Sequence, residues 1–121
     1  MRFYKCDECD DLVLQLFSKD GPMLDCPAGR TEVKVGTIDA SLEKHVPHIK
    51  REGDILKVQI GEVEHPMIPE HWIDFILAEK TNGFELIKLK PGDAPYAEFD
   101  AKDVVAVYEF CNLHGLWKAE I

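Results

Sequence analysis

Residues 73–89 have the sequence IDFILAEKTNGFELIKL and indicate two strands joined by a tight turn. Ile73, Phe75 and Leu77 occupy every second position, which is typical of a strand with one buried face. An Asn-Gly dipeptide follows, and this pair is typical of β-hairpin turns. The second strand is expected over residues 84–89. The stretch therefore predicts an antiparallel β fold.

Other parts of the chain carry the same signal. Alternating apolar residues at 56–60, an apolar β-branched run at 104–110 and a closing segment at 116–121 predict three more strands. Residues 91–95 (PGDAP) predict a rigid loop, and no long stretch has the 3.6-residue period of a helix. Short strands separated by turn signals favour a sandwich or a barrel. The sequence therefore predicts an all-β fold.

The N-terminal part of the chain differs from the rest in composition. Residues 1–35 hold three of the four cysteines and no histidine, with turn residues around a short apolar run at 12–17. So short a segment cannot support a core of its own and needs a covalent or metal staple, or a neighbour. We expect a small module over residues 1–35, a linker at 36–41 and a main domain over 36–121.

Charge and hydropathy exclude several classes of partner. The chain has 121 residues and a formal net charge of −9, which disfavours binding to nucleic acid or to an anionic membrane. No stretch approaches the ~20 apolar residues of a membrane-spanning helix, and the first residues lack the apolar core of a signal peptide. We therefore expect a cytoplasmic protein whose cysteines serve metals rather than disulfides.

The histidines point to a metal site. All five lie in three short segments, residues 43–48, 65–72 and 111–115, and the third segment also holds Cys111. Imidazole and thiolate bind borderline metals such as iron and zinc. Four histidines with one thiolate exceed the four ligands of a structural zinc. They suit a five-coordinate metal with a sixth position open for chemistry.

These segments also resemble a known family. The strings EKHVP (residues 43–47), HPMIPEHW (65–72), KPGDAP (90–95) and CNLHGLWK (111–118) occur in this order. They resemble superoxide reductases, the desulfoferrodoxin and neelaredoxin family, from about Gly36 to the C-terminus. The resemblance implies a seven-stranded immunoglobulin-like β-sandwich that binds one non-haem iron.

The resemblance also implies a ligand set. Four histidines would lie in a plane around the iron and one cysteine on its axis, with the opposite position open. The implied ligands are His45, His65, His71, His114 and Cys111. His45 and His48 compete for one position, and the family pattern places the ligand at His45. His48 is then an ordinary surface or near-site histidine.

The implied activity is the one-electron reduction of superoxide to hydrogen peroxide through an Fe(II)/Fe(III) cycle. An external donor such as rubredoxin would supply the electrons. The resemblance assigns Lys44 the role of a local cation that attracts superoxide, which the net charge would otherwise repel. It assigns Glu43 to the open position of the oxidised metal. Relatives form dimers or tetramers, and we expect a homodimer.

The N-terminal cysteines resemble the desulforedoxin-like module of desulfoferrodoxins, which is a small rubredoxin-like domain, but the match is incomplete. Cys6, Cys9 and Cys26 would supply three of four thiolates, and Asp25 stands where the fourth is expected. A zinc or iron site with Asp25 as oxygen ligand is one reading. A metal-free remnant is the other.

Two further functions remain open from the sequence. The histidine site could hold zinc in a non-enzymatic metal-binding β module, since zinc has no redox chemistry. Alternatively, a coordinatively saturated iron could make the protein a pure electron carrier. Lys44 argues against the carrier, because a carrier needs no cation beside its metal.

Overall fold

The structure is a computed structural model that describes residues 1–9, 11–16, 29–38 and 40–121. These residues form two compact units, Met1–Lys34 and Val35–Ile121. Among the described residues, no helix is long and apolar enough to cross a membrane.

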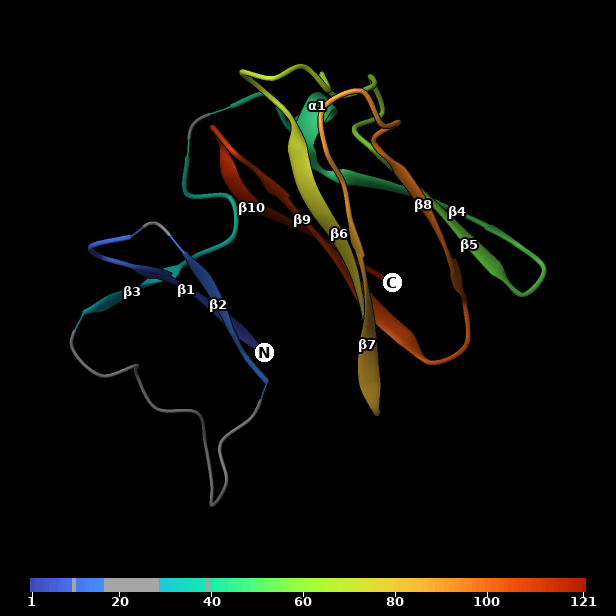
Figure 1. Cartoon of the computed structure of the whole chain (residues 1–121). Helices are drawn as coiled ribbons and strands as arrows, with labels where there is room; N and C mark the ends of the chain where they lie inside the picture. The colour runs from blue at the N-terminus through green and yellow to red at the C-terminus, as the bar shows by residue number, and fades with distance from the viewer. Residues whose placement is uncertain (10, 17–28, 39) are drawn as a thin grey trace. The chain divides into compact units, whose positions relative to one another are not determined.

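The N-terminal unit is a three-stranded antiparallel sheet with the order β2-β1-β3 (Figure 1). Its strands are β1 (Arg2–Cys6), β2 (Leu12–Gln15) and β3 (Arg30–Val33). The central strand β1 carries two buried aromatic side chains, Phe3 and Tyr4. The apolar run expected at residues 12–17 thus begins with a strand, and its last residue lies outside the described part.

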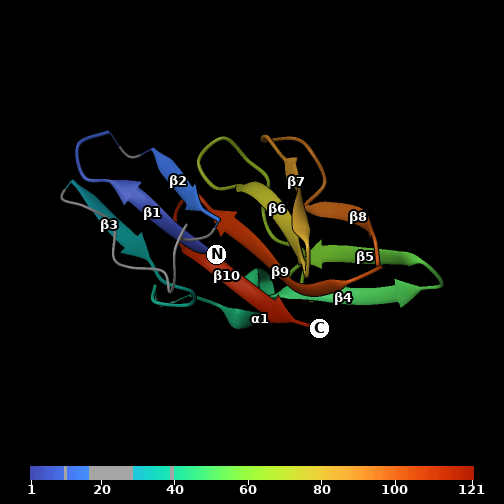
Figure 2. The same ribbon diagram turned by 90° about the horizontal axis from the view of Figure 1, so that it is seen from below.

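The larger unit is a sandwich of two antiparallel sheets (Figures 1 and 2). Its strands are β4 (Pro47–Glu52), β5 (Ile55–Ile60), β6 (Ile73–Lys80), β7 (Gly83–Lys88), β8 (Tyr96–Asp100), β9 (Val104–Cys111) and β10 (Gly115–Glu120). One sheet has the order β10-β9-β6-β7 and the other β4-β5-β8. The expected all-β fold, a seven-stranded sandwich preceded by a small module, is confirmed.

The core lies between the two sheets. Val58 and Ile60 of β5, Ile76 of β6 and Val107 of β9 are each 0% exposed and belong to one packed apolar cluster. Burying such a side chain completely contributes about 1.5–3 kcal/mol. This rigid interior fixes the strand ends, and therefore the starting points of the loops between them.

Strand β6 differs from the sequence prediction. Ile73 pairs with Cys111 and Phe75 with Phe110, so one extra residue, Asp74, forms a bulge. The bulge reverses the alternation, because Ile73 and Ile76 face the core while Phe75 does not join that cluster. Ile73, Phe75 and Leu77 are all buried, as predicted, but they do not share one face, so the prediction of a single buried face was wrong.

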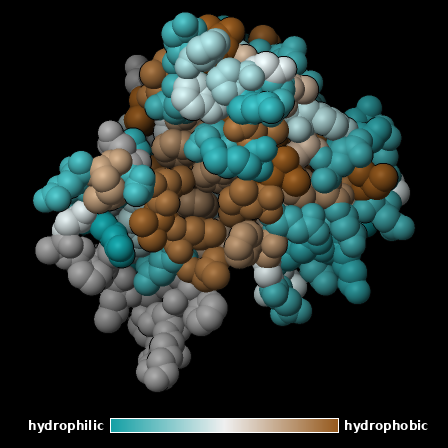
Figure 3. Space-filling model, in the orientation of Figure 1, coloured by the Kyte–Doolittle hydropathy of each residue, from teal (hydrophilic) through white to brown (hydrophobic). Residues whose placement is uncertain are grey.

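The hairpin is confirmed, but its turn lies one residue earlier than the Asn-Gly pair suggests. Lys80 pairs with Gly83, which leaves Thr81 and Asn82 as the turn residues. Strand β7 is an edge strand, and all its residues are exposed. Its apolar side chains contribute to the brown surface over β6 and β7 in Figure 3, whereas the side formed by β4, β5 and β8 is mostly hydrophilic.

Three elements of the larger unit carried too little signal for prediction from the residues. Helix α1 (Leu42–His45) is a single turn, closed by a hydrogen bond from Val46 N–H to the Leu42 carbonyl at 3.0 Å. Strand β4 is a mainly polar edge strand, and strand β8 buries only Ala97 and Phe99. Sequence periodicity detects strands through their apolar side chains, so these short elements are missed.

Candidate metal centre

Loops at one end of the sandwich carry the predicted site residues (Figure 1, top). His45 is the last residue of α1, and His65 lies in the loop after β5. His71 lies shortly before β6 begins. Cys111 ends β9, and His114 lies in the turn that leads into β10. Segments far apart in sequence thus meet on a rigid scaffold, which is a common origin of functional sites.

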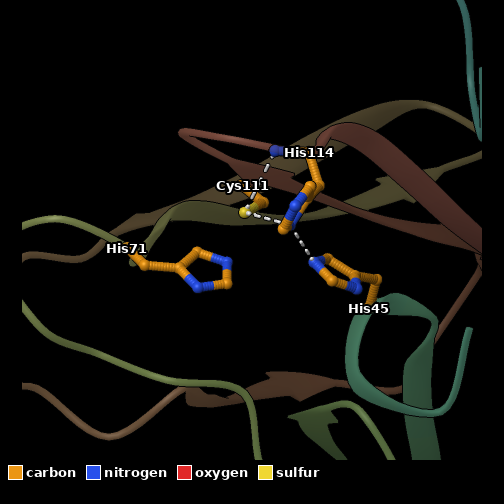
Figure 4. A group of neighbouring side chains, drawn as sticks. All are labelled: His45, His71, Cys111 and His114. Carbon is orange, nitrogen blue, oxygen red and sulfur yellow. Dashed lines mark hydrogen bonds between the residues drawn. The ribbon is translucent and has the colours of Figure 1, made fainter. Parts of the chain in front are cut away.

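The five side chains converge. Ligand atoms of His45, His71, Cys111 and His114 all lie within 4.8 Å of one another (Figure 4). His65 joins this group, because its Nε2 lies 3.2 Å from Nε2 of His45. The structure therefore brings together four imidazoles and one thiol that the sequence places in three separate segments.

Backbone carbonyls fix the tautomers of two of these histidines. Nδ1 of His45 lies 2.7 Å from the Ser41 carbonyl oxygen, and Nδ1 of His65 lies 2.6 Å from that of Pro66. A carbonyl only accepts, so each Nδ1 carries the proton and each neutral ring keeps a lone pair on Nε2. Metal-binding histidines are usually oriented in this way by the nitrogen that does not bind the metal.

The facing nitrogens fit a metal ion. Two neutral rings with lone pairs 3.2 Å apart have no proton to share between them. A cation resolves this conflict, because two nitrogens bound at about 2.1 Å and at a right angle lie about 3.0 Å apart. Nδ1 of His114 lies 3.0 Å from Nε2 of His45, which is the same spacing. Nε2 of His71 is buried and has no hydrogen-bond partner within the part of the chain that the structure describes.

Cys111 is placed as a fifth donor. Its side chain is 0% exposed, and its sulfur lies 3.8 Å from Nδ1 of His114. Burial raises the pKa of the thiol, while backbone N–H groups that include that of His114, 3.4 Å from the sulfur, oppose this shift. A bound metal favours the thiolate, and the N–H donors then tune its charge.

Burial also keeps the histidines neutral. It lowers the pKa of His65 to about 4, and it lowers the pKa values of His45 and His71 in the same direction. The positive charges that neighbouring rings would acquire add to this effect. Neutral imidazole is the form that binds metals, so these side chains are ready to bind at neutral pH.

Glu109 introduces a carboxyl group close to this site. It lies two residues before Cys111, is 0% exposed, and neither of its oxygens has a partner among the described residues. Burial raises the pKa of the carboxyl well above its usual value. The charge of this carboxyl in turn raises the pKa of the Cys111 thiol, so Glu109 acts on the sulfur through space.

Trp117 contacts two of the histidines, and the sequence predicted no role for it. Its ring centroid lies 5.1 Å from that of His45, with a tilt of 31°. Its indole N–H donates to the His114 carbonyl at 3.0 Å, and the residue is only 4% exposed. The only sequence signal for this contact with the site is the position of Trp117 shortly after the CNLHG string.

Lys44, Glu43 and His48 lie outside the cluster. All three are exposed, and His48 stands on β4 opposite Gln59. The charge of Lys44 contributes to the lowered pKa values of His45 and His71, so it acts on the site through space. Ser41 donates its hydroxyl to the Glu43 carboxylate at 3.3 Å.

A glycine supports the segment that carries Lys44. Gly61 has φ +82°, and a Cβ built on it would lie 2.3 Å from the Val63 carbonyl oxygen and 2.6 Å from that of Lys44. Two backbone bonds join the segments, from Gly61 N–H to Val46 at 3.2 Å and from Val63 N–H to Glu43 at 3.0 Å. Only glycine fits here without displacing the backbone of Lys44.

The N-terminal cysteines are described only in part. Cys6 ends β1 and Cys9 lies in the turn that follows, whereas Asp25 and Cys26 lie outside the described residues. A hydrogen bond between the two thiols lowers the pKa of Cys6 and raises that of Cys9.

Comparison with known proteins finds relatives that match nearly the whole chain. The desulfoferrodoxin family model matches residues 37–120. A desulfoferrodoxin from Nitratidesulfovibrio vulgaris is 45% identical over 119 residues, covering 97% of this chain and 94% of that protein. A superoxide reductase from Pyrococcus horikoshii is 33% identical over 99 residues, covering 65% of this chain and 86% of that protein.

A solved structure matches both units. The crystal structure of the superoxide reductase from Treponema pallidum has a TM-score of 0.74 and 34% identity, and the match covers 98% of each chain. Fold and site together define a β-sandwich protein with a histidine and cysteine metal centre. The chain belongs to the desulfoferrodoxin and superoxide reductase family.

Proposed function

We propose that this protein reduces superoxide to hydrogen peroxide, a step in which superoxide takes up one electron and two protons. The observation that carries the proposal is the meeting of four imidazoles and one buried thiol at one loop end of the sandwich. The chemical reason is that imidazole nitrogens together with a thiolate sulfur suit a borderline, redox-active metal. Membership of the family supports the choice of superoxide as substrate.

The proposed ligands are the five converging residues His45, His65, His71, His114 and Cys111. Iron, when bound by them, supplies the electron and passes between Fe(II) and Fe(III). The chain orients the rings through carbonyls and Trp117, and it directs backbone N–H groups at the sulfur. A metal-bound Cys111 thiolate would donate electron density to that metal, as thiolate ligands do in haem enzymes.

We assign the approach of substrate to Lys44. The chain carries a formal charge of −9, so an anion is repelled at long range. An exposed ammonium beside the histidines reverses that field over the last few ångströms. Glu43, the neighbouring exposed residue, is assigned to the open position of the oxidised metal.

The remaining assignments concern the whole protein. We assign residues 1–35 to a desulforedoxin-like module and 36–121 to the iron-binding domain. Cys6 and Cys9, with Asp25 and Cys26, are a candidate site for zinc or iron in the first. An external donor such as rubredoxin returns the electron, and the protein works as a homodimer in the cytoplasm.

Metal analysis combined with a kinetic assay tests this function. Purified protein should contain iron at the main site and consume superoxide without releasing dioxygen, provided a reduced rubredoxin is present. The dismutation reaction would release dioxygen, so an oxygen electrode separates the two activities. Protein loaded with zinc alone, and inactive toward superoxide after iron is offered, would contradict the proposal.

A further inference from the structure

Asn112 joins the two loops that carry four of the five candidate ligands. Its side-chain Oδ1 accepts a hydrogen bond from Trp72 N–H at 2.8 Å, and its Nδ2 donates to the Glu70 carbonyl at 3.0 Å. Its backbone N–H donates to the Trp72 carbonyl at 3.1 Å. These three bonds hold the backbone on both sides of His71.

The orientation of the amide follows from its partners. A backbone N–H requires an acceptor and a carbonyl requires a donor, so only one amide orientation satisfies both. The bonds continue the pairing of β6 with β9, which ends at Ile73 and Cys111. Beyond that point the side chain of Asn112 takes the place of the missing strand partner.

His71 depends on this support more than its neighbours do. The rings of His45 and His65 are each anchored by a carbonyl at Nδ1. The buried Nε2 of His71 has no partner in the described part of the chain. The backbone of His71 is held by a two-way pairing with Ile68, both bonds being 3.0 Å, and by the Asn112 bonds on either side.

We propose that Asn112 is a positioning residue that fixes His71 in the metal site and couples its loop to the one with Cys111. This inference rests on the metal site proposed above and deepens it. Asn112 itself contributes no ligand atom. Partners that orient metal ligands typically change metal affinity about 10–100-fold when removed.

Zinc release from the full chain tests the proposal without any redox assay. For this test every protein, including the parent, carries the substitutions Cys6→Ser and Cys9→Ser. Zinc bound at the N-terminal cysteines then does not contribute to the measured release. We expect Asn112→Ala to lose zinc to a chromogenic chelator about 10–100-fold faster than its parent. Asn112→Asp should also release it faster, since a carboxylate oxygen replaces the donor to Glu70. Leu113→Ala, an exposed neighbour in the same loop, is the matched control and should behave as the parent.

A double-mutant cycle separates positioning of His71 from general loss of structure. In a His71→Ala background there is no ring to position, so adding Asn112→Ala should change the release rate by less than about twofold. An undiminished effect in that background would overturn the proposal. So would an Asn112→Ala protein that holds zinc as tightly as its parent. A parent that binds no zinc would overturn the metal site itself, so the two failures are distinguishable.

Discussion

Nε2 of His45 and Nε2 of His65 face each other at 3.2 Å, although each ring keeps its proton on the opposite nitrogen. Two lone pairs at this distance repel unless a cation lies between them. Protonation of either ring could also relieve the contact, but burial opposes that charge. The arrangement is therefore stable chiefly with a metal bound, which ties the stability of the site to pH.

The metal-free protein should lose stability as the pH falls. The pKa of His65 is about 4 in the folded chain, against a reference value of 6.5. Between these values the unfolded chain binds the proton and the folded chain does not, so lower pH favours unfolding. The loss is of order 3 kcal/mol from His65 across this window, with further loss in the same direction from His45 and His71.

Urea unfolding of metal-free protein at several pH values between 4 and 7 measures this effect. His65→Gln removes the titrating group and should flatten the profile, while His48→Gln, an exposed histidine, should leave it steep. A wild-type profile that is level from pH 7 to pH 4 would contradict the assignment of neutral, buried rings.

His45 and His48 should differ sharply in metal binding. His45 lies in the cluster and His48 on the exposed side of β4. We expect His45→Ala to lose iron or retain it at least about tenfold more weakly, since it removes one of five donors. His48→Ala should keep one iron at the main site. Iron content of the two purified variants decides, and the reverse result would show that the ligand assignment in this segment is wrong.

Gly61→Ala should disturb the segment that carries Lys44. A Cβ at Gly61 would lie 2.6 Å from the Lys44 carbonyl oxygen, and the residue has φ +82°. We expect a loss of stability of about 2 kcal/mol or more and a slower reaction with superoxide. Gly53 is the matched control, with φ +60° and nothing within 4 Å of a Cβ.

Gly53→Ala should cost about 1–2 kcal/mol through backbone conformation alone and leave the reaction rate unchanged. Thermal unfolding and stopped-flow rates of both variants separate backbone strain at the glycine from displacement of the segment that carries Lys44. Equal effects of the two substitutions would mean that contact with Lys44 does not matter.

Lys44→Ala should slow the second-order reaction with superoxide by up to about tenfold, because the attraction for the anion is lost. The ferric spectrum should remain nearly unchanged, since the lysine binds no metal. Lys50→Ala removes the same charge from an exposed site on β4 and should have little effect. Added salt should slow the wild type more than Lys44→Ala, and identical salt dependence would leave Lys44 without a role.

Sequence patterns predicted the parts of this protein that depend on residue type and period. Apolar alternation located β5 and the hairpin of β6 and β7, and the histidines with Cys111 indicated the side chains that converge. The bulge at Asp74 was missed because an extra residue leaves no mark in the apolar pattern. Strand β4 was missed because an edge strand buries little.

The hydrogen bonds that hold the candidate ligands in place could not be predicted from the sequence either. The carbonyls of Ser41 and Pro66 fix two tautomers, yet every residue has a carbonyl. The bonds of Asn112 to residues about 40 positions away depend on how two loops meet. Such contacts arise from packing of the completed sandwich, so no local pattern in the sequence marks them.

Optical spectroscopy of the oxidised protein, with metal analysis, tests the central claim most directly. An Fe(III) centre with Cys111 thiolate bound should give a visible thiolate-to-iron band, and Cys111→Ser should lose both that band and superoxide reduction. Residues at the N-terminal site do not enter this comparison, because only Cys111 is changed. A Cys111→Ser protein that keeps its colour and its steady turnover would contradict the assignment of an iron–thiolate centre at this site.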